Sequence, residues 1–318
     1  MMKDLVIIAG PTAVGKSSLA VKLAGKINGS IISADSMQVY KGMDIGTAKI
    51  TEEEMEGIPH YLIDVLDPAE DFNIVRFKEM ATDAINEISA AGRVPMIVGG
   101  TGFYIQSVLY DIDFTEEEDG STFRDELTAL IDERGSEYVH KMLEEADPVA
   151  AQKIHHNDHK RMIRALEYHR QTGMPISAHN EKSHQNEARY NFCYFFLDDD
   201  RQKIYERINS RVDKMIADGL VDEVKTLMKR GLSADNVSMH GLGYKEIIDY
   251  LDGNCDLKTA VMLIKKGSRH FAKRQLTWSR REKDVIRLDL SKDPDVMATI
   301  MNELDRKGII NGRSVFDI

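Results

Sequence analysis

The residues whose types and spacing most clearly indicate a chemical role lie near the start of the chain, in the run Gly-Pro-Thr-Ala-Val-Gly-Lys-Ser at positions 10–17. Its spacing matches G-x-x-x-x-G-K-[ST], and it lies between an apolar run and a helical pattern, which is typical of a phosphate-binding loop. The glycines let backbone N–H groups surround phosphate oxygens, and the helix start adds partial positive charge. Lys16 supplies a point charge, and the Ser17 hydroxyl is a ligand for Mg²⁺. We predict a phosphate site formed by Gly10, Pro11, Thr12, Ala13, Val14, Gly15, Lys16 and Ser17.

Two polar side chains follow the next apolar run, residues 31–34. Asp35 comes directly after it, and the carboxyl ends of strands in open α/β sheets face the ligand crevice. Asp35 could act as a general base or contact Mg²⁺ through water, or it could cap the turn. Gln38 has the amide geometry for a bidentate bond to an adenine edge, although alone it could be an ordinary surface residue.

Two later apolar runs also end in candidate residues. Asp64 follows Tyr-Leu-Ile at 61–63 and is a metal-side carboxylate or a cap. Gly-Gly-Thr-Gly at 99–102 closes another run, and its glycines permit a ligand to approach closely. Thr101 offers a hydroxyl at the start of the next helix, where it could also be the N-cap.

The elements that must position these residues form an α/β core. Short apolar runs predict strands, and helical patterns lie between them, so we expect a parallel sheet flanked by helices. The expected strands are residues 5–9, 31–34, 61–65, 94–98, 191–197 and 285–288, and the expected helices are residues 16–28, 75–88, 201–229, 244–250 and 257–281, with a helical tail.

The pattern changes in the middle of the chain. From about residue 122 to 172 only helical patterns occur. We therefore expect an all-helical insertion domain, residues 112–190, within a catalytic core made of residues 1–111 and 191–318.

Composition is typical of a soluble globular protein, with 318 residues, 42% of them hydrophobic and 30% charged. No apolar run approaches the roughly 18 residues that cross a bilayer. Cys193 and Cys255 are too few for a disulfide framework, and we find no secretory signal. We expect a cytoplasmic monomer that has no obligate protein partner and does not bind a membrane.

The distribution of charge along the chain says more about possible partners than the net charge does. The net charge of −11, taken alone, argues against a nucleic-acid partner. Residues 153–170 and 265–283 are nevertheless strongly basic, which fits a phosphate backbone or a solvated helix face. Arg207 and Arg211 lie four apart on one helical face, where they could clamp a diphosphate or pair with acidic neighbours.

Together these motifs resemble the tRNA dimethylallyltransferases over nearly the full chain. The matching segments are residues 10–17, Ser-Ala-Asp-Ser-Met-Gln-Val-Tyr at 33–40, Met-Asp-Ile-Gly-Thr-Ala-Lys at 43–49, Ile-Pro-His-Tyr-Leu-Ile-Asp at 58–64, Val-Gly-Gly-Thr-Gly-Phe-Tyr at 98–104, Asp-His-Lys-Arg-Met-Ile-Arg-Ala-Leu-Glu at 158–167, Gly-Tyr-Lys-Glu at 243–246 and Arg-Gln-Leu-Thr-Trp-Ser-Arg at 274–280. The 33–49 block is far more specific than the phosphate loop. Val14 and Ser17 depart slightly from the family, but Ser17 keeps the hydroxyl.

The resemblance implies dimethylallyl diphosphate as the donor and Mg²⁺ as the cofactor. It implies as acceptor the adenosine 3′-adjacent to the anticodon, in tRNAs that read codons beginning with U. Residues 12–17 would bind the diphosphate. The residues implied to contact tRNA are Asp35, Ser36, Met37, Gln38, Thr101, Arg124, His159, Lys160, Arg161, Met162 and Ile163.

Adenine's exocyclic amine is a weak nucleophile, because its lone pair is delocalised into the ring. We expect Lys16, Mg²⁺ on Ser17, and Arg207 or Arg211 to oppose the charge on the leaving diphosphate. Asp35 would accept the amine proton, with Thr101 beside the extruded base.

Three other functions compete with this hypothesis. They are prenyl transfer to free adenine nucleotides, phosphorylation of a small metabolite, and RNA binding with a vestigial phosphate loop. A GTPase is disfavoured, since the chain has no N/T-K-x-D motif. The insertion and the basic segments favour the larger substrate.

Overall fold

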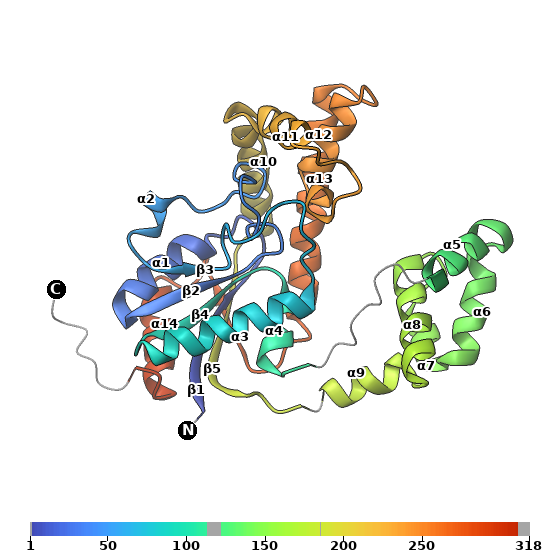
Figure 1. Ribbon diagram of the computed structural model, residues 1–318. Coiled ribbons are helices and arrows are strands. Elements are labelled where there is room, and N and C mark those ends of the chain that lie inside the picture. Colours follow the sequence, from blue (N-terminus) through green and yellow to red (C-terminus); the bar gives the residue numbers. More distant parts are fainter. Residues whose placement is uncertain (1, 113–121, 185, 311–318) are drawn as a thin grey trace. The chain divides into compact units, whose positions relative to one another are not determined.

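The computed structural model describes residues 2–112, 122–184 and 186–310 (Figure 1). The chain divides into two compact units, one of residues 1–109 and 189–318 and the other of residues 110–188. The predicted insertion, residues 112–190, differs from the second unit by two residues at each end. The two units are described separately below.

The first unit is built on a parallel sheet, as the apolar runs predicted. Within the described residues, six strands are ordered β3-β2-β4-β1-β5-β6, and every pairing is parallel. The strands are β1 (Lys3–Ala9), β2 (Gly29–Ala34), β3 (His60–Tyr61), β4 (Val94–Gly99), β5 (Tyr190–Asp198) and β6 (Val285–Asp289). The observed sheet confirms the predicted α/β fold class.

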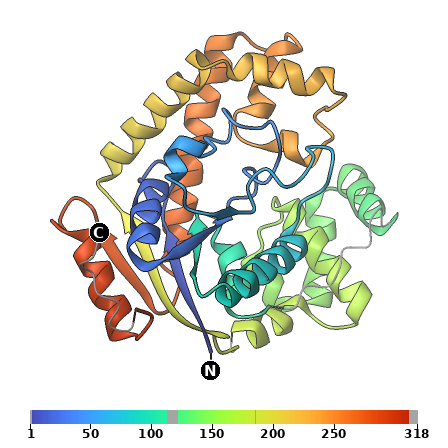
Figure 2. The same ribbon diagram turned by 60° about the vertical axis from the view of Figure 1, so that its left-hand side comes forward.

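Helices cover both faces of this sheet (Figure 2). Val6 and Ile8 share one buried core with α1 and α14, while the alternate residues Leu5 and Ile7 are also fully buried. A strand that is apolar on both sides belongs in such a parallel sheet. The helices of the first unit are α1 (Lys16–Ile27), α2 (Glu52–Met55), α3 (Ile74–Ala90), α4 (Gly102–Leu109), α10 (Arg201–Ala217), α11 (Leu220–Lys229), α12 (Tyr244–Leu251), α13 (Leu257–Ser279) and α14 (Val296–Arg306), with a 3₁₀ turn at Val237–His240. No helix in the described part of the chain combines the length and apolarity needed to span a bilayer.

Two sequence predictions about the elements were wrong in detail. The helix predicted over residues 201–229 is two helices, because Gly219 adopts a left-handed conformation, φ 104°, between them. The strand predicted over residues 61–65 stops at Tyr61, because Leu62 and Asp64 take positive φ values of 62° and 54°. The chain therefore turns at residues 62–64, where the apolar composition alone predicted an extended strand.

The second unit contains helices alone among its described elements. They are α5 (Thr122–Arg134), α6 (Ser136–Ala146), α7 (Pro148–Lys153), α8 (His159–Thr172) and α9 (Ile176–His184). Asp147 caps α7, where Pro148 occupies the first turn, and Asp158 caps α8. Leu127, Val139 and Leu143 belong to a core that lies within this unit. The insertion therefore has its own hydrophobic core.

Gly99 provides a test of how tightly the central strands are packed. A Cβ at Gly99 would lie 2.3 Å from the Ala34 carbonyl oxygen, on the backbone of β2. We expect Gly99→Ala to destabilise the protein by about 1–3 kcal/mol, since overpacking must separate two strands. The expected fall in the midpoint of thermal unfolding is roughly 2–12 °C, followed by circular dichroism.

The matched control is Gly25→Ala, at an exposed helical glycine that has open space around its Cβ position. This change should leave the unfolding midpoint unchanged or raise it slightly, because alanine is the better helix former. Equal midpoints for the two variants would contradict the packing argument.

Candidate active site

The strand order brings three sequence-predicted segments to one edge of the sheet. The phosphate loop follows β1, Asp35 follows β2, and the 99–102 turn follows β4, which lies between those two strands. Gly99 is the register partner of both Ala9 and Ala34, so the three strands end at the same level. The turn that carries Thr101 therefore begins between the strand ends that lead to the phosphate loop and to Asp35.

The phosphate loop connects β1 directly to α1. Gly15 is the N-cap of α1 in a left-handed conformation, φ 101°, which favours glycine. Gly10 is also required, because a Cβ there would lie 2.7 Å from the Leu197 carbonyl oxygen of β5. Lys16 and Ser17 begin the helix, where free N–H groups and the dipole favour an anion.

Lys16 is folded back onto this loop. Its Nζ donates hydrogen bonds to the carbonyl oxygens of Gly10, at 3.0 Å, and Pro11, at 2.8 Å. The pKa of Lys16 is lowered to about 8, mainly by burial and also by the charge of Arg211, while the charge of Asp35 acts in the opposite direction. The ammonium group thus belongs to one electrostatic cluster with Asp35 and Arg211.

Asp35 shapes the turn that carries its neighbours. Its Oδ1 accepts hydrogen bonds from the backbone N–H groups of Met37, at 2.8 Å, and Gln38, at 3.4 Å. Among the described residues, Oδ2 accepts no hydrogen bond. The capping role and a chemical role are therefore compatible, because they use different oxygens of one carboxylate.

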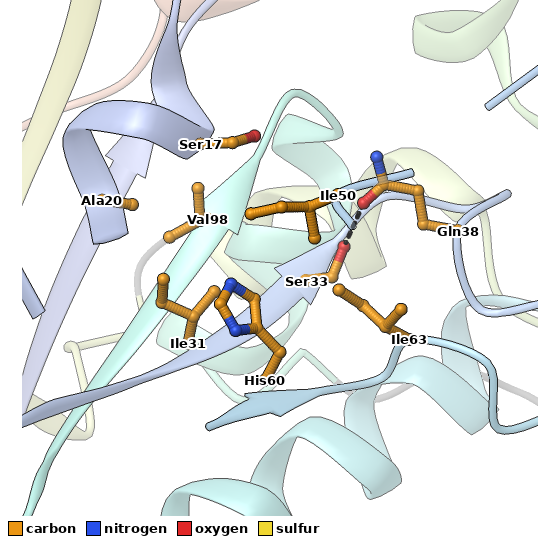
Figure 3. A pocket seen from close by; sticks show the side chains of 9 residues that line it. All are labelled: Ser17, Ala20, Ile31, Ser33, Gln38, Ile50, His60, Ile63 and Val98. Atoms are coloured by element: carbon orange, nitrogen blue, oxygen red, sulfur yellow. Dashed lines mark hydrogen bonds between the residues drawn. The ribbon is translucent and has the colours of Figure 1, made fainter. Parts of the chain in front are cut away.

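Gln38 lies close to the start of α1 in a small pocket (Figure 3). Its Oε1 accepts a hydrogen bond from Ser33 Oγ at 3.1 Å, and its Nε2 lies 3.4 Å from the carbonyl oxygens of both Thr47 and Ala48. Ser17 also lines the cavity, whose volume of about 20 Å³ leaves room for roughly one water molecule. The other lining residues are Ala20, Ile31, Ile50, His60, Ile63 and Val98.

The loop over residues 43–49 is held by a residue that sequence reasoning missed. Glu223 Oε2 accepts hydrogen bonds from the N–H groups of Asp44 and Ile45, and its Oε1 accepts from Gly46 N–H and the Tyr244 hydroxyl. This loop supplies the carbonyl groups near Gln38. No motif marks Glu223, since its partners lie about 180 residues away in the sequence.

The interpretation of Asp64 as a metal ligand is not supported. Lys49, whose side chain is 5% exposed, places its Nζ 2.5 Å from Asp64 and 2.6 Å from Asp44. The same ammonium donates to the Tyr40 carbonyl oxygen at 2.7 Å. Asp64 therefore neutralises a buried cation that closes the 43–49 loop.

The two arginines of α10 have different surroundings. Arg207 forms an ion pair with Asp199, whereas the positive charge of Arg211 lowers the pKa of Lys16. Arg207 thus pairs with an acidic side chain eight residues before it, and Asp213, two residues after Arg211, is bound by Lys265 at 2.6 Å. Of the two arginines, Arg211 is therefore the one that interacts electrostatically with the phosphate loop.

Gln275 of α13 joins two of the three loops. Its Oε1 accepts a hydrogen bond from Thr12 N–H at 2.8 Å, and its Nε2 donates to the Gly100 carbonyl oxygen at 3.1 Å. Thr101 follows, and its carbonyl oxygen accepts from Tyr104 N–H at 3.0 Å in the first turn of α4. Sequence reasoning treated residues 265–283 as a basic segment that includes a family motif at 274–280, and it missed this contact.

The site has few protein ligands for a metal ion. No cluster of three or more His, Cys, Asp or Glu side chains suitable for a metal occurs among the described residues. Mg²⁺ usually keeps several waters and is bound through one or two protein oxygens plus substrate phosphates. The Ser17 hydroxyl at the helix start fits that mode, so these residues suit a Mg²⁺ ion that arrives with a diphosphate.

The second unit divides the predicted tRNA-contact residues of α8 by burial. The side chains of Met162 and Ile163 are buried in the core of the insertion. His159, Lys160 and Arg161 are exposed on the first turn of α8. The two buried residues anchor the turn that presents the three exposed ones.

Arg124 makes a strong contact within the second unit. Its Nε and Nη2 donate to the two carboxylate oxygens of Glu167 at 2.8 and 2.7 Å, which links α5 to α8. Glu167 is 5% exposed. Arg124 thus supports this unit internally, whatever it contacts outside.

Comparisons with known proteins agree with this geometry. A family model described as IPP transferase matches residues 38–282, and one described as isopentenyl transferase matches residues 3–69. The chain is 55% identical over 312 residues to a tRNA dimethylallyltransferase of Lachnoclostridium phytofermentans, covering 97% of this chain and 100% of that protein. It is 52% identical over 293 residues to one of Carboxydothermus hydrogenoformans, covering 92% and 94%.

Solved structures give the same result. The tRNA isopentenylpyrophosphate transferase of Bacillus halodurans superposes with a TM-score of 0.72 at 44% identity, covering 96% of this chain and 98% of that one. A eukaryotic dimethylallyltransferase acting on tRNA superposes with a TM-score of 0.79 at 28% identity, covering 99% and 81%. From its loops, its sheet and these relatives, the chain belongs to the tRNA dimethylallyltransferase family.

Proposed function

We propose that the enzyme transfers a dimethylallyl group from dimethylallyl diphosphate to the N6 amine of the adenosine 3′-adjacent to the anticodon, in tRNAs that read codons beginning with U. The observation that carries this proposal is the electrostatic cluster of Lys16 after β1, Asp35 after β2 and Arg211 of α10. In this cluster, Lys16 and Arg211 can stabilise the negative charge of a leaving diphosphate, and the Asp35 carboxylate can accept a proton from the amine.

The donor side of the reaction uses the phosphate loop. Residues 12–17 bind the diphosphate, with backbone N–H groups other than that of Thr12, which Gln275 holds, and Lys16 exchanges its bonds to Gly10 and Pro11 for phosphate oxygens. Arg211 adds charge from α10, while Arg207 stays with Asp199. Mg²⁺, held by Ser17 and the diphosphate, would supply further charge stabilisation to the leaving group.

The acceptor side uses Asp35 and Thr101. Oδ1 of Asp35 stays with the turn, which leaves Oδ2 to receive the proton of the amine. Thr101 lies beside the base on the central strand end. Gln38 exchanges its weak 3.4 Å contacts for the adenine edge.

The basic segments favour a large acceptor that has a phosphate backbone. Lys273, Arg280 and Arg281 on or next to α13, and the first turn of α8, offer exposed cations to a phosphate backbone. The target base lies in an anticodon loop and has to leave its stack before it can react. A free nucleotide would need neither surface, and a metabolite kinase would need no general base for an amine. We further propose that the enzyme acts as a monomer in the cytoplasm.

A labelling experiment separates these acceptors. With labelled dimethylallyl diphosphate and Mg²⁺, we expect label to enter tRNA and not AMP. ATP turnover with small metabolites and without RNA is the result expected of a kinase. Label in AMP at a rate equal to that in tRNA would replace the proposal with the free-nucleotide reaction.

Asp35→Asn tests the general base. Asparagine keeps the Oδ1 acceptor of the turn but cannot take a proton, so turnover should fall about 10²- to 10⁴-fold while tRNA affinity is retained. Single-turnover rates and equilibrium tRNA binding measure the two effects. Asp256→Asn, which alters only the N-cap of α13, is the matched control. Full activity of Asp35→Asn would remove the base from the mechanism.

The ionisation of Lys16 predicts a pH dependence of donor binding. The ammonium form, which attracts the diphosphate, predominates below a pKa of about 8 and is lost as the pH rises through that value. Affinity for pyrophosphate, measured by calorimetry between pH 7 and 10, should therefore be greatest below pH 8. Above it, affinity should weaken by up to about tenfold per pH unit.

The two arginines provide matched variants for this profile. Arg211→Gln removes a charge that lowers the pKa of Lys16, so the decline should begin at a higher pH. Arg207→Gln should leave the midpoint unchanged, because Arg207 is paired with Asp199. A profile that is flat between pH 7 and 10 would contradict the role of Lys16.

A further inference from the structure

One buried polar side chain of α13 connects the donor and acceptor loops. Gln275 is 7% exposed, and every other buried residue of this helix is alanine, isoleucine or serine. Its carboxamide is used at both ends, with Oε1 accepting from Thr12 N–H at 2.8 Å and Nε2 donating to the Gly100 carbonyl oxygen at 3.1 Å. A buried carboxamide that binds two different loops fixes their separation.

The glycines beside Thr101 fit this arrangement. A Cβ at Gly100 would lie 1.9 Å from Gln275 Nε2, and a Cβ at Gly102 would lie 2.2 Å from the Trp278 indole. Gln275 and Trp278 are three residues apart, so they lie on the same face of α13. Thr101 therefore lies between two glycines whose backbone packs directly against α13.

Only a carboxamide satisfies both partners. A glutamate would keep an acceptor for Thr12 N–H but would turn a second acceptor toward the Gly100 carbonyl oxygen. A leucine of similar size would leave both backbone groups without a partner, and unpaired buried polar groups are strongly disfavoured. The identity of the side chain therefore matters beyond its volume.

We infer that Gln275 is a positioning residue for prenyl transfer, which sets the distance between the phosphate loop and Thr101. The inference rests on the proposed roles of those two loops. In the reaction, the C1–O bond of the donor breaks and diphosphate leaves with the electron pair. C1 bonds to N6 of adenine, and Asp35 takes the N6 proton. If the loops are misaligned, water attacks C1 instead, loses its proton to solvent and forms dimethylallyl alcohol.

The competition between adenine and water provides the test. Labelled dimethylallyl diphosphate, saturating tRNA and Gln275→Leu would be used to measure both prenylated tRNA and free alcohol. We expect the tRNA rate to fall about 10- to 100-fold, as small misplacements of reacting groups do, with a larger fraction of donor lost to water. Affinities for tRNA and for pyrophosphate should change by less than about threefold, a range well below the rate effect.

Two further variants make the result decisive. Gln202→Leu removes an exposed glutamine of α10 whose carboxamide, within the described part of the chain, binds Glu206 alone, and it should match the wild type in rate and partition. Gln275→Glu retains the size and the Thr12 acceptor, so it should fold if Gln275→Leu does not, and it should still divert donor to water. Unchanged partition in the folded Gln275 variants, or rate losses that only follow loss of folded protein, would overturn the positioning role.

The wild-type enzyme separates this inference from the proposed function. If the wild type labels no tRNA, the proposed function is at fault. If the wild type labels tRNA and the Gln275 variants do so with equal rate and partition, only the positioning role is overturned.

Discussion

The parallel alignment of β2, β4 and β1 is the constraint on which the site depends. Their C-terminal ends lie at one level, with Gly99 paired to Ala34 on one side and to Ala9 on the other. Each strand then delivers a different chemical group: a carboxylate after β2, a hydroxyl after β4 and a phosphate loop after β1. Glycine at position 99 allows this spacing, because a side chain there would meet the β2 backbone.

The charges around this edge suit the proposed reaction, in which an anion departs and an amine loses a proton. Lys16 is held by the carbonyl oxygens of its own loop, and its pKa is lowered mainly by burial. In the proposed reaction, an incoming diphosphate would restore the environment that an ammonium ion prefers, so donor binding and the charge of Lys16 would reinforce each other. Asp35 is close enough to stabilise this ammonium, which couples the two halves of the site electrostatically.

The second layer of the site consists of residues that act through others. Glu223 holds the 43–49 loop by three backbone N–H groups and the Tyr244 hydroxyl, and that loop places two carbonyl groups near Gln38. Lys49 closes the same loop through Asp44 and Asp64. Such contacts fix the geometry of the reacting groups, on which the efficiency of transfer depends.

Glycine spacing and hydrophobic periodicity are local properties, so they were enough to predict the phosphate loop, the parallel sheet and the helical insertion. Packing between distant segments distinguished Arg211 from Arg207, buried Met162 and Ile163 away from solvent, and paired Asp64 with Lys49. It alone brought Gln275 to Thr12, 263 residues away. A side chain's partner depends on which helix face meets which loop, and that is decided by packing between distant segments, which no local pattern encodes.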